Sequence, residues 1–126
     1  MTVHSETKWS DGRNFPEIRA ERRDGNIIEF DLFVGANLFQ FQGHFPNEPV
    51  LPGVAQIDWA ARLGQQHFGI NGPIARLGQL KFSRLVGADS LLHLRLEWNN
   101  EKQRLLFSYR EGDETCSSGY FELSTQ

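Results

Sequence analysis

The stretch Gly53–Phe68, GVAQIDWAARLGQQHF, decides the fold, because it stands alone as a helix candidate in this chain. Pro52 just before it suits a helix N-terminus, where the first N–H groups have no partner inside the helix. Its apolar side chains form two stripes on a helical wheel, which is typical of a largely buried helix. The first stripe is Val54, Ile57, Ala60, Ala61, Gly64 and Phe68, the second is Trp59 and Leu63, and a polar strip holds Asp58, Arg62 and Gln65.

The segments on both sides of this helix predict strands. Asp24-Gly25 is a hairpin signal between residues 17–23 and 26–34. Alternating apolar and polar residues, with turn residues between the runs, predict further strands at residues 74–86, 92–98, 105–109 and about 115–123. We therefore expect an α+β fold in which an antiparallel sheet of about six strands wraps around one long central helix. The hot-dog fold has this form.

Length and charge limit the class of protein. The 126 residues suit one domain with a single core, over residues 15–126, after a polar N-terminal lead-in at residues 1–14. The 13 Lys and Arg against 16 Asp and Glu give a net charge of −3. This balance argues against nucleic-acid binding, which needs a dense basic face.

The sequence favours a cytoplasmic location. Cys116 is the single cysteine and has no partner for an internal disulfide, which fits a reducing compartment. Residues 1–14 lack the apolar core of a secretory signal. No apolar run approaches the ~20 residues that span a bilayer, so we expect no membrane association.

The loop before the helix carries a candidate base. His44 lies among three prolines, Pro46, Pro49 and Pro52, which restrict the backbone and can hold the imidazole ring still. A positioned histidine of this kind suits proton transfer. The other interpretation is an exposed histidine in an ordinary proline-rich connection.

Two helix residues are further candidates. Asp58 lies beside an apolar stripe and needs a partner there, so it is either a proton donor or one half of an ion pair with Arg62, four residues on. Gly53 would let a carbonyl oxygen approach its N–H at the positive end of the helix. It is otherwise a turn glycine.

The segment from Gly43 to Asp58 closely resembles the active-site segment of 3-hydroxyacyl-(acyl-carrier-protein) dehydratases, hot-dog enzymes of fatty-acid and related synthesis. That family has His-Phe-Pro or His-Phe-Ile, two variable residues, Pro-Val-hydrophobic-Pro-Gly, and an acid five residues after the glycine, and the chain meets every spacing. Residues 81–89, KFSRLVGAD, resemble the strand and turn that follow the helix, with Leu85 in place of a proline. The resemblance covers about residues 26–123.

The resemblance implies loss of water from a 3-hydroxyacyl thioester to give the trans-2-enoyl thioester, without a metal or an organic cofactor. His44 would take the C2 proton, the Gly53 N–H would hold the thioester oxygen, and Asp58 would protonate the leaving hydroxyl. Arg62 stands where the family usually has glutamine. This departure fits a specialised branch, such as one serving polyene or polyketide-like lipid synthesis.

The resemblance also implies what surrounds the site. The acyl chain would lie in an apolar tunnel between two hot-dog subunits, a homodimer or a hetero-pair, with His44 of one subunit facing Asp58 of the other. Lys81 and Arg84 would form a local basic patch that docks the acidic acyl carrier protein. The expected tunnel lining is Phe39, Phe41, Val54, Ile57, Ala61 and Phe82.

Two other functions stay open at this point. A hot-dog thioesterase would hydrolyse the thioester, and many such enzymes place a carboxylate on the helix, although they lack the His-Phe-Pro and Pro-Gly loop. A non-catalytic acyl-binding subunit of a dehydratase pair is the second alternative. Incubation with hydroxyacyl and enoyl thioesters separates these three functions. A dehydratase interconverts the two thioesters, a thioesterase releases free thiol, and a non-catalytic subunit binds the carrier protein without converting either thioester.

Overall fold

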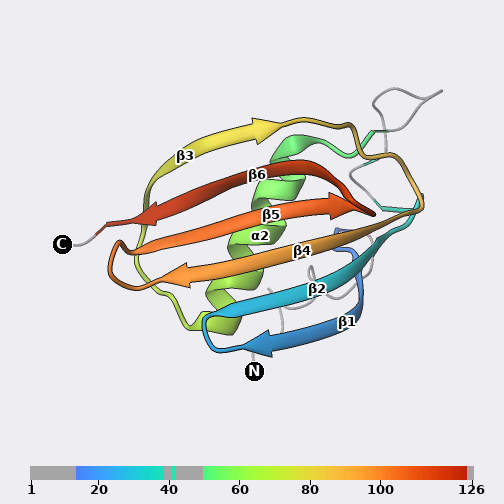
Figure 1. Cartoon of the computed structure of the whole chain (residues 1–126). Helices are drawn as coiled ribbons and strands as arrows, with labels where there is room; N and C mark the ends of the chain where they lie inside the picture. The colour runs from blue at the N-terminus through green and yellow to red at the C-terminus, as the bar shows by residue number, and fades with distance from the viewer. Residues whose placement is uncertain (1–13, 39–40, 42–49, 125–126) are drawn as a thin grey trace.

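The computed structural model describes residues 14–38, 41 and 50–124, and its strands form one antiparallel sheet with a helix across one face (Figure 1). The strand order across the sheet is β1-β2-β4-β5-β6-β3, so β1 and β3 are the edge strands. The arrangement is the α+β class that the sequence predicts. The elements are β1 (Glu17–Asp24), β2 (Ile27–Val34), α2 (Gly53–Phe68), β3 (Ile74–Phe82), β4 (Ser90–Asn99), β5 (Arg104–Glu111) and β6 (Glu114–Leu123).

The first hairpin is built as the sequence predicts. β1 and β2 pair antiparallel as far as Asp24 and Ile27, which leaves Gly25 and Asn26 as a two-residue turn. Gly25 has a φ of 63°, a conformation that glycine adopts without a steric penalty. The local turn signal therefore sets the pairing register of these two strands.

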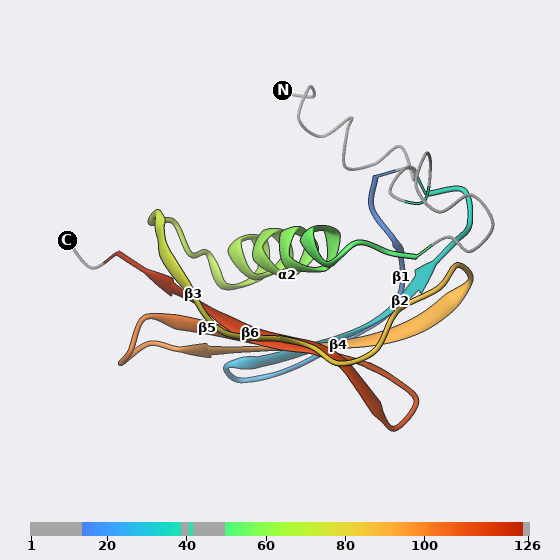
Figure 2. The same cartoon turned by 90° about the horizontal axis from the view of Figure 1, so that it is seen from above.

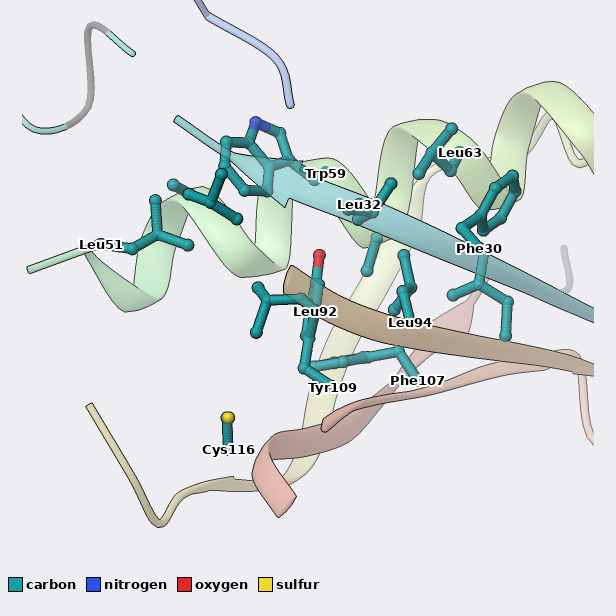
Figure 3. Packing of buried hydrophobic residues seen from close by; sticks show 14 of the residues in the cluster. Phe30, Leu32, Leu51, Trp59, Leu63, Leu92, Leu94, Phe107, Tyr109 and Cys116 are labelled. Atoms are coloured by element: carbon teal, nitrogen blue, oxygen red, sulfur yellow. The ribbon is translucent and has the colours of Figure 1, made fainter. Parts of the chain in front are cut away.

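The core lies between α2 and the face of the sheet that curves around it (Figure 2). Trp59 and Leu63 on the helix pack over alternate side chains of the strands (Figure 3). Burying an apolar side chain of this size stabilises a fold by roughly 1.5–3 kcal/mol, whereas an exposed ion pair contributes roughly 0.2–1 kcal/mol. The apolar contacts therefore dominate the attachment of helix to sheet. The strand residues labelled in Figure 3 are Phe30, Leu32, Leu92, Leu94, Phe107, Tyr109 and Cys116.

The helix has the predicted bounds, but its buried face differs from the predicted one. Trp59 and Leu63 of the second stripe are fully buried, as expected. Val54 of the first stripe is 74% exposed. The prediction that both stripes are buried is therefore wrong for the single chain, because the sheet covers only one side of the helix. The buried residues of that side are Ala55, Gln56, Trp59, Ala60, Leu63 and Gly64.

Candidate active site

The structure places two of the three predicted catalytic groups. Gly53 is the first residue of α2, and Asp58 lies on the second turn of the same helix. His44, the predicted base, lies outside the described residues, as does Phe39 of the predicted tunnel lining. The acid and the backbone N–H can therefore be described from the structure, and the base stays a prediction.

The start of α2 is held against the loop between β3 and β4. The Leu51 N–H donates to the Val86 carbonyl oxygen at 2.8 Å. Pro52 then has an extended backbone, with φ −64° and ψ 148°, and makes no side-chain cap. Its carbonyl oxygen accepts from the N–H groups of Ala55 and Gln56, at 3.1 and 3.4 Å. The chain thus enters the helix in a fixed direction.

The first turn of α2 has two N–H groups without a partner inside the helix. Within the described part of the chain, the N–H groups of Gly53 and Val54 have no hydrogen-bond acceptor. Such groups carry the positive end of the helix dipole and suit a developing negative oxygen. The predicted role of Gly53 is therefore compatible with the geometry of the helix start.

The ring of Phe82 explains why residue 53 has no side chain. A Cβ atom at Gly53 would lie 2.8 Å from two ring carbons of Phe82, closer than carbon atoms approach each other. Phe82 is the last residue of β3, and half of its surface is exposed. The aromatic ring of Phe82 thus lies against the first residue of α2.

Asp58 points away from the sheet and pairs with Arg62. The Arg62 Nε lies 2.9 Å from Oδ1 and 3.1 Å from Oδ2 of the carboxylate. About half of each side chain is exposed. The ion pair that the spacing predicts is therefore present, and it leaves the Asp58 carboxyl group accessible from the side opposite the sheet.

The predicted tunnel residues fall into two groups in the single chain. Phe41 is buried in the core, and Ile57 and Ala61 are partly buried against it. Val54 and Phe82 are exposed at the start of the helix. Leu85, which the sequence analysis did not assign to the site, adds to this exposed group with 77% of its surface accessible. The sequence signal that could have pointed to Leu85 is its place in the motif, where the dehydratase pattern has a proline.

The two predicted docking residues differ in their surroundings. The Arg84 guanidinium forms ion pairs with Glu114 and, at 3.6 Å, with Glu111. Lys81 is exposed and has no ion-pair partner among the residues that the structure describes. The charge of Arg84 is therefore shared with two carboxylates, and Lys81 is the freer of the two cations.

Buried polar residues beneath the helix were missed by the sequence analysis. Gln56 lies in the buried face of α2 and contacts Tyr109 and Ser117 of the sheet. The sequence signal for these residues was a glutamine between apolar helix positions. A buried amide needs hydrogen-bond partners, so such a glutamine indicates polar side chains on the facing strands. These contacts join the site to the sheet, two residues before Asp58.

Some kinds of site are absent from the described ranges. No group of three or more His, Cys, Asp or Glu side chains in residues 14–38, 41 and 50–124 is arranged to hold a metal ion. Over the same ranges, no helix combines the length and apolar character needed to cross a bilayer. Cys116 is buried, and this burial raises the pKa of its thiol, which disfavours the reactive thiolate.

Comparison with known proteins decides the family. The model of the ApeI-like family, described as ApeI dehydratase, matches residues 20–120. The chain belongs to this family. This ApeI-like chain is also similar to the 3-hydroxyacyl-[acyl-carrier-protein] dehydratase FabZ of Clostridium novyi, with 42% identity over 71 residues. That match covers 51% of the chain and 50% of the relative, so the chain spans about half the length of the curated relatives it matches.

Solved structures confirm the hot-dog fold. The ApeI-like chain superimposes on a chain of the dehydratase heterocomplex ApeI:P from Xenorhabdus doucetiae with a TM-score of 0.82 and 30% identity, covering 87% of this chain and 98% of that one. An uncharacterized protein from Erwinia carotovora subsp. atroseptica gives a TM-score of 0.76 and 33% identity, with 87% and 96% covered. At these TM-scores and coverages the predicted architecture is confirmed.

Proposed function

We propose that this protein removes water from 3-hydroxyacyl thioesters of acyl carrier protein and so produces trans-2-enoyl thioesters. One observation carries the proposal within a family of dehydratases: an accessible carboxyl group, Asp58, lies five residues beyond an open helix N–H, at Gly53. Five residues correspond to about 7.5 Å along the helix axis. Two groups at this spacing can serve the carbonyl oxygen and the C3 hydroxyl of the same acyl chain.

The proposed reaction uses one group at each reacting atom. His44 takes the C2 proton, and negative charge moves to the thioester oxygen beside the Gly53 N–H. The C3–O bond then breaks as protonated Asp58 gives its proton to the leaving hydroxyl, and water departs. A positioned acid or base of this kind contributes typically ~10²–10⁴-fold in rate. Preorganised N–H groups stabilise the charge that develops on the oxygen.

We further propose that the active form is a pair of hot-dog subunits, either two copies of this chain or this chain with another subunit. β3 is an edge strand with a free row of backbone groups, and its apolar side chains are exposed. A second subunit would cover them, and His44 of one subunit would then work with Asp58 of its partner. The exposed apolar residues of β3 are Ile74, Leu77, Leu80 and Phe82.

The partner in catalysis is the acyl carrier protein, which Lys81 and Arg84 would dock by charge. The chain has a net charge of −3, so only a local patch can attract an acidic carrier. The setting that we propose is cytoplasmic lipid synthesis, in the fatty-acid or the related polyene and polyketide-like branch.

Mass spectrometry of a carrier-bound 3-hydroxyacyl series, incubated with the pure protein, tests the proposed function. Loss of one water from the acyl chain, with the thioester intact, is the expected result. Release of free carrier thiol would instead indicate a thioesterase. Binding of the carrier without interconversion, alone and after addition of a second hot-dog subunit from the same source, would indicate a non-catalytic partner subunit.

A further inference from the structure

A buried polar trio joins the helix to the sheet. Gln56 on α2 is 3% exposed, and Tyr109 on β5 and Ser117 on β6 are fully buried. The Ser117 hydroxyl donates to the Gln56 Oε1 at 2.6 Å. The Tyr109 hydroxyl donates to the Gln56 backbone oxygen at 2.7 Å. One helix residue is therefore held through both its side chain and its backbone.

The two donors come from one rigid unit. Tyr109 and Ser117 are directly opposite each other in the ladder between β5 and β6. β5 and β6 are interior strands, each paired on both sides. The two hydroxyl groups therefore have fixed positions in the sheet, and Gln56 must match both of them.

Hydrogen bonds make the contact between helix and sheet directional, which apolar packing alone does not. Burial of apolar surface is non-directional, so it does not by itself fix the exact rotation and axial position of a helix on a sheet. A buried hydrogen bond requires a narrow range of distance and angle, and breaking it leaves a costly unpaired group. The trio thus restricts both the rotation of α2 about its axis and its shift along that axis.

The trio lies at the functional end of the helix. Gln56 follows Gly53 by three residues, less than one turn, and precedes Asp58 by two. Two residues turn a helix by about 200°, so Asp58 lies on the face opposite the sheet. At the other end, Arg23 donates to the carbonyl oxygen of His67 at 2.9 Å. Gln56 therefore holds the first turns of α2 against β5 and β6, in addition to the Leu51–Val86 hydrogen bond before the helix.

We propose that Gln56, held by Tyr109 and Ser117, is a positioning residue that sets where the Asp58 carboxyl and the Gly53 N–H meet the substrate. This inference rests on the proposed dehydratase function. Burial, with a smaller effect from the Asp58 charge, raises the pKa of Tyr109 well above its usual value, so the phenol stays a donor. Neither hydroxyl touches the reacting atoms, so both act through the helix.

Steady-state kinetics of Ser117→Ala, Gln56→Leu and the double variant test the inference. Each single variant should lower kcat by about 10- to 100-fold with little change in KM, because small misplacements of catalytic groups cost this much. The double variant should be no slower than the worse single variant, since both remove one bond. Tyr109→Phe, which removes only a hydroxyl, should also lower kcat.

Ser118→Ala is the matched control. Ser118 neighbours Ser117 but lies opposite Ser108, half-buried, on the face of the sheet away from the helix. Its kcat should equal that of the wild type. A wild-type kcat in Ser117→Ala, or an equal loss in Ser118→Ala, would overturn the inference. So would a lower melting temperature with an unchanged kcat, since the trio would then only stabilise the fold.

A readout without turnover separates this inference from the proposed function. Residual dipolar couplings of the α2 amides measure the orientation of the helix against the sheet. They should change in Ser117→Ala and Gln56→Leu and stay unchanged in Ser118→Ala. If the wild type dehydrates none of the thioesters, the proposed function fails. The couplings still decide the positional claim, because an unchanged orientation in every variant would refute it.

Discussion

Asp58 combines a structural contact with an accessible carboxyl group. Its ion pair with Arg62 lies on the surface, where water competes with the pair and limits its contribution to roughly 0.2–1 kcal/mol. A residue kept only for that pair would contribute little to the protein. We propose that the accessible carboxyl serves in proton transfer, and separate substitutions of Asp58 and Arg62 distinguish this role from the ion pair.

Asp58→Asn should lose activity by about 10²-fold or more, because an amide cannot protonate a leaving hydroxyl. Its melting temperature should stay within a few degrees of the wild type. Arg62→Gln is the matched control, since it breaks the same ion pair and leaves the carboxyl in place. It should remain active. Rates of thioester hydration and thermal melts of both variants check this, and a fully active Asp58→Asn would return Asp58 to a structural role.

At the scale of elements, three strands are joined by charges on the outer face of the sheet. Asp31 on β2 accepts from Arg22 on β1 at 3.2 Å and contacts Nδ1 of His93 on β4, also at 3.2 Å. The hydrogen bond from Arg22 lowers the pKa of Asp31, and His93 adds to this. A carboxyl whose pKa is lowered by folding stabilises the folded state at pH values above its unfolded pKa.

Asp31→Asn should therefore lower the melting temperature at pH 7 and have a shrinking effect as the pH falls. The wild-type advantage should begin to shrink as the pH approaches the unfolded pKa of about 4, and it should be lost as the pH falls through the lowered pKa of folded Asp31. Thermal melts across this range measure the difference. Asp113→Asn, in the turn before β6, is the control. If the melting temperature of Asp31→Asn stays below that of the wild type by the same amount down to pH 2, the Asp31 carboxylate is not the source of the stabilisation.

The end of β3 and the following loop carry the proposed docking residues. Lys81→Glu should raise KM for carrier-bound substrate and leave KM for a pantetheine thioester nearly unchanged, because only the carrier is acidic. Arg84→Gln is preferable to a charge reversal, which would place a third carboxylate beside Glu111 and Glu114. Lys102→Glu, in the turn between β4 and β5, is the control. Equal effects on both substrates would exclude docking.

The elements themselves could be predicted from the sequence because their signals are local. The bounds of α2 follow from helical periodicity after Pro52, and the first hairpin follows from Asp24-Gly25. The buried face of the helix could not be predicted, since Gln56 faces the core through donors more than fifty residues away in the chain. Motif spacing located Gly53 and Asp58 on the helix. The paired state of Arg84 depends on Glu114, which only the folded sheet brings close.

The whole molecule is expected to share its sites between two subunits. Mixing inactive His44→Ala and Asp58→Asn proteins, with subunit exchange, should restore activity. A mixed dimer has one site with both lesions and one with neither, so up to about half the wild-type rate per dimer is expected from the two-fold symmetry. Native mass spectrometry establishes that mixed dimers form. If they form without any recovery, each site lies within one chain or the reaction is not this one.

The position of β6 has a consequence for how the chain is made. β6 is synthesised after the other five described strands, yet it lies inside the sheet, with β5 on one side and β3 on the other. β3 therefore leaves the ribosome well before the strand that it pairs with, and until then its backbone N–H and C=O groups have no partner strand. A stop codon just before Glu114 would remove an interior strand, and the shortened polypeptide would be a substrate for chaperones and proteases.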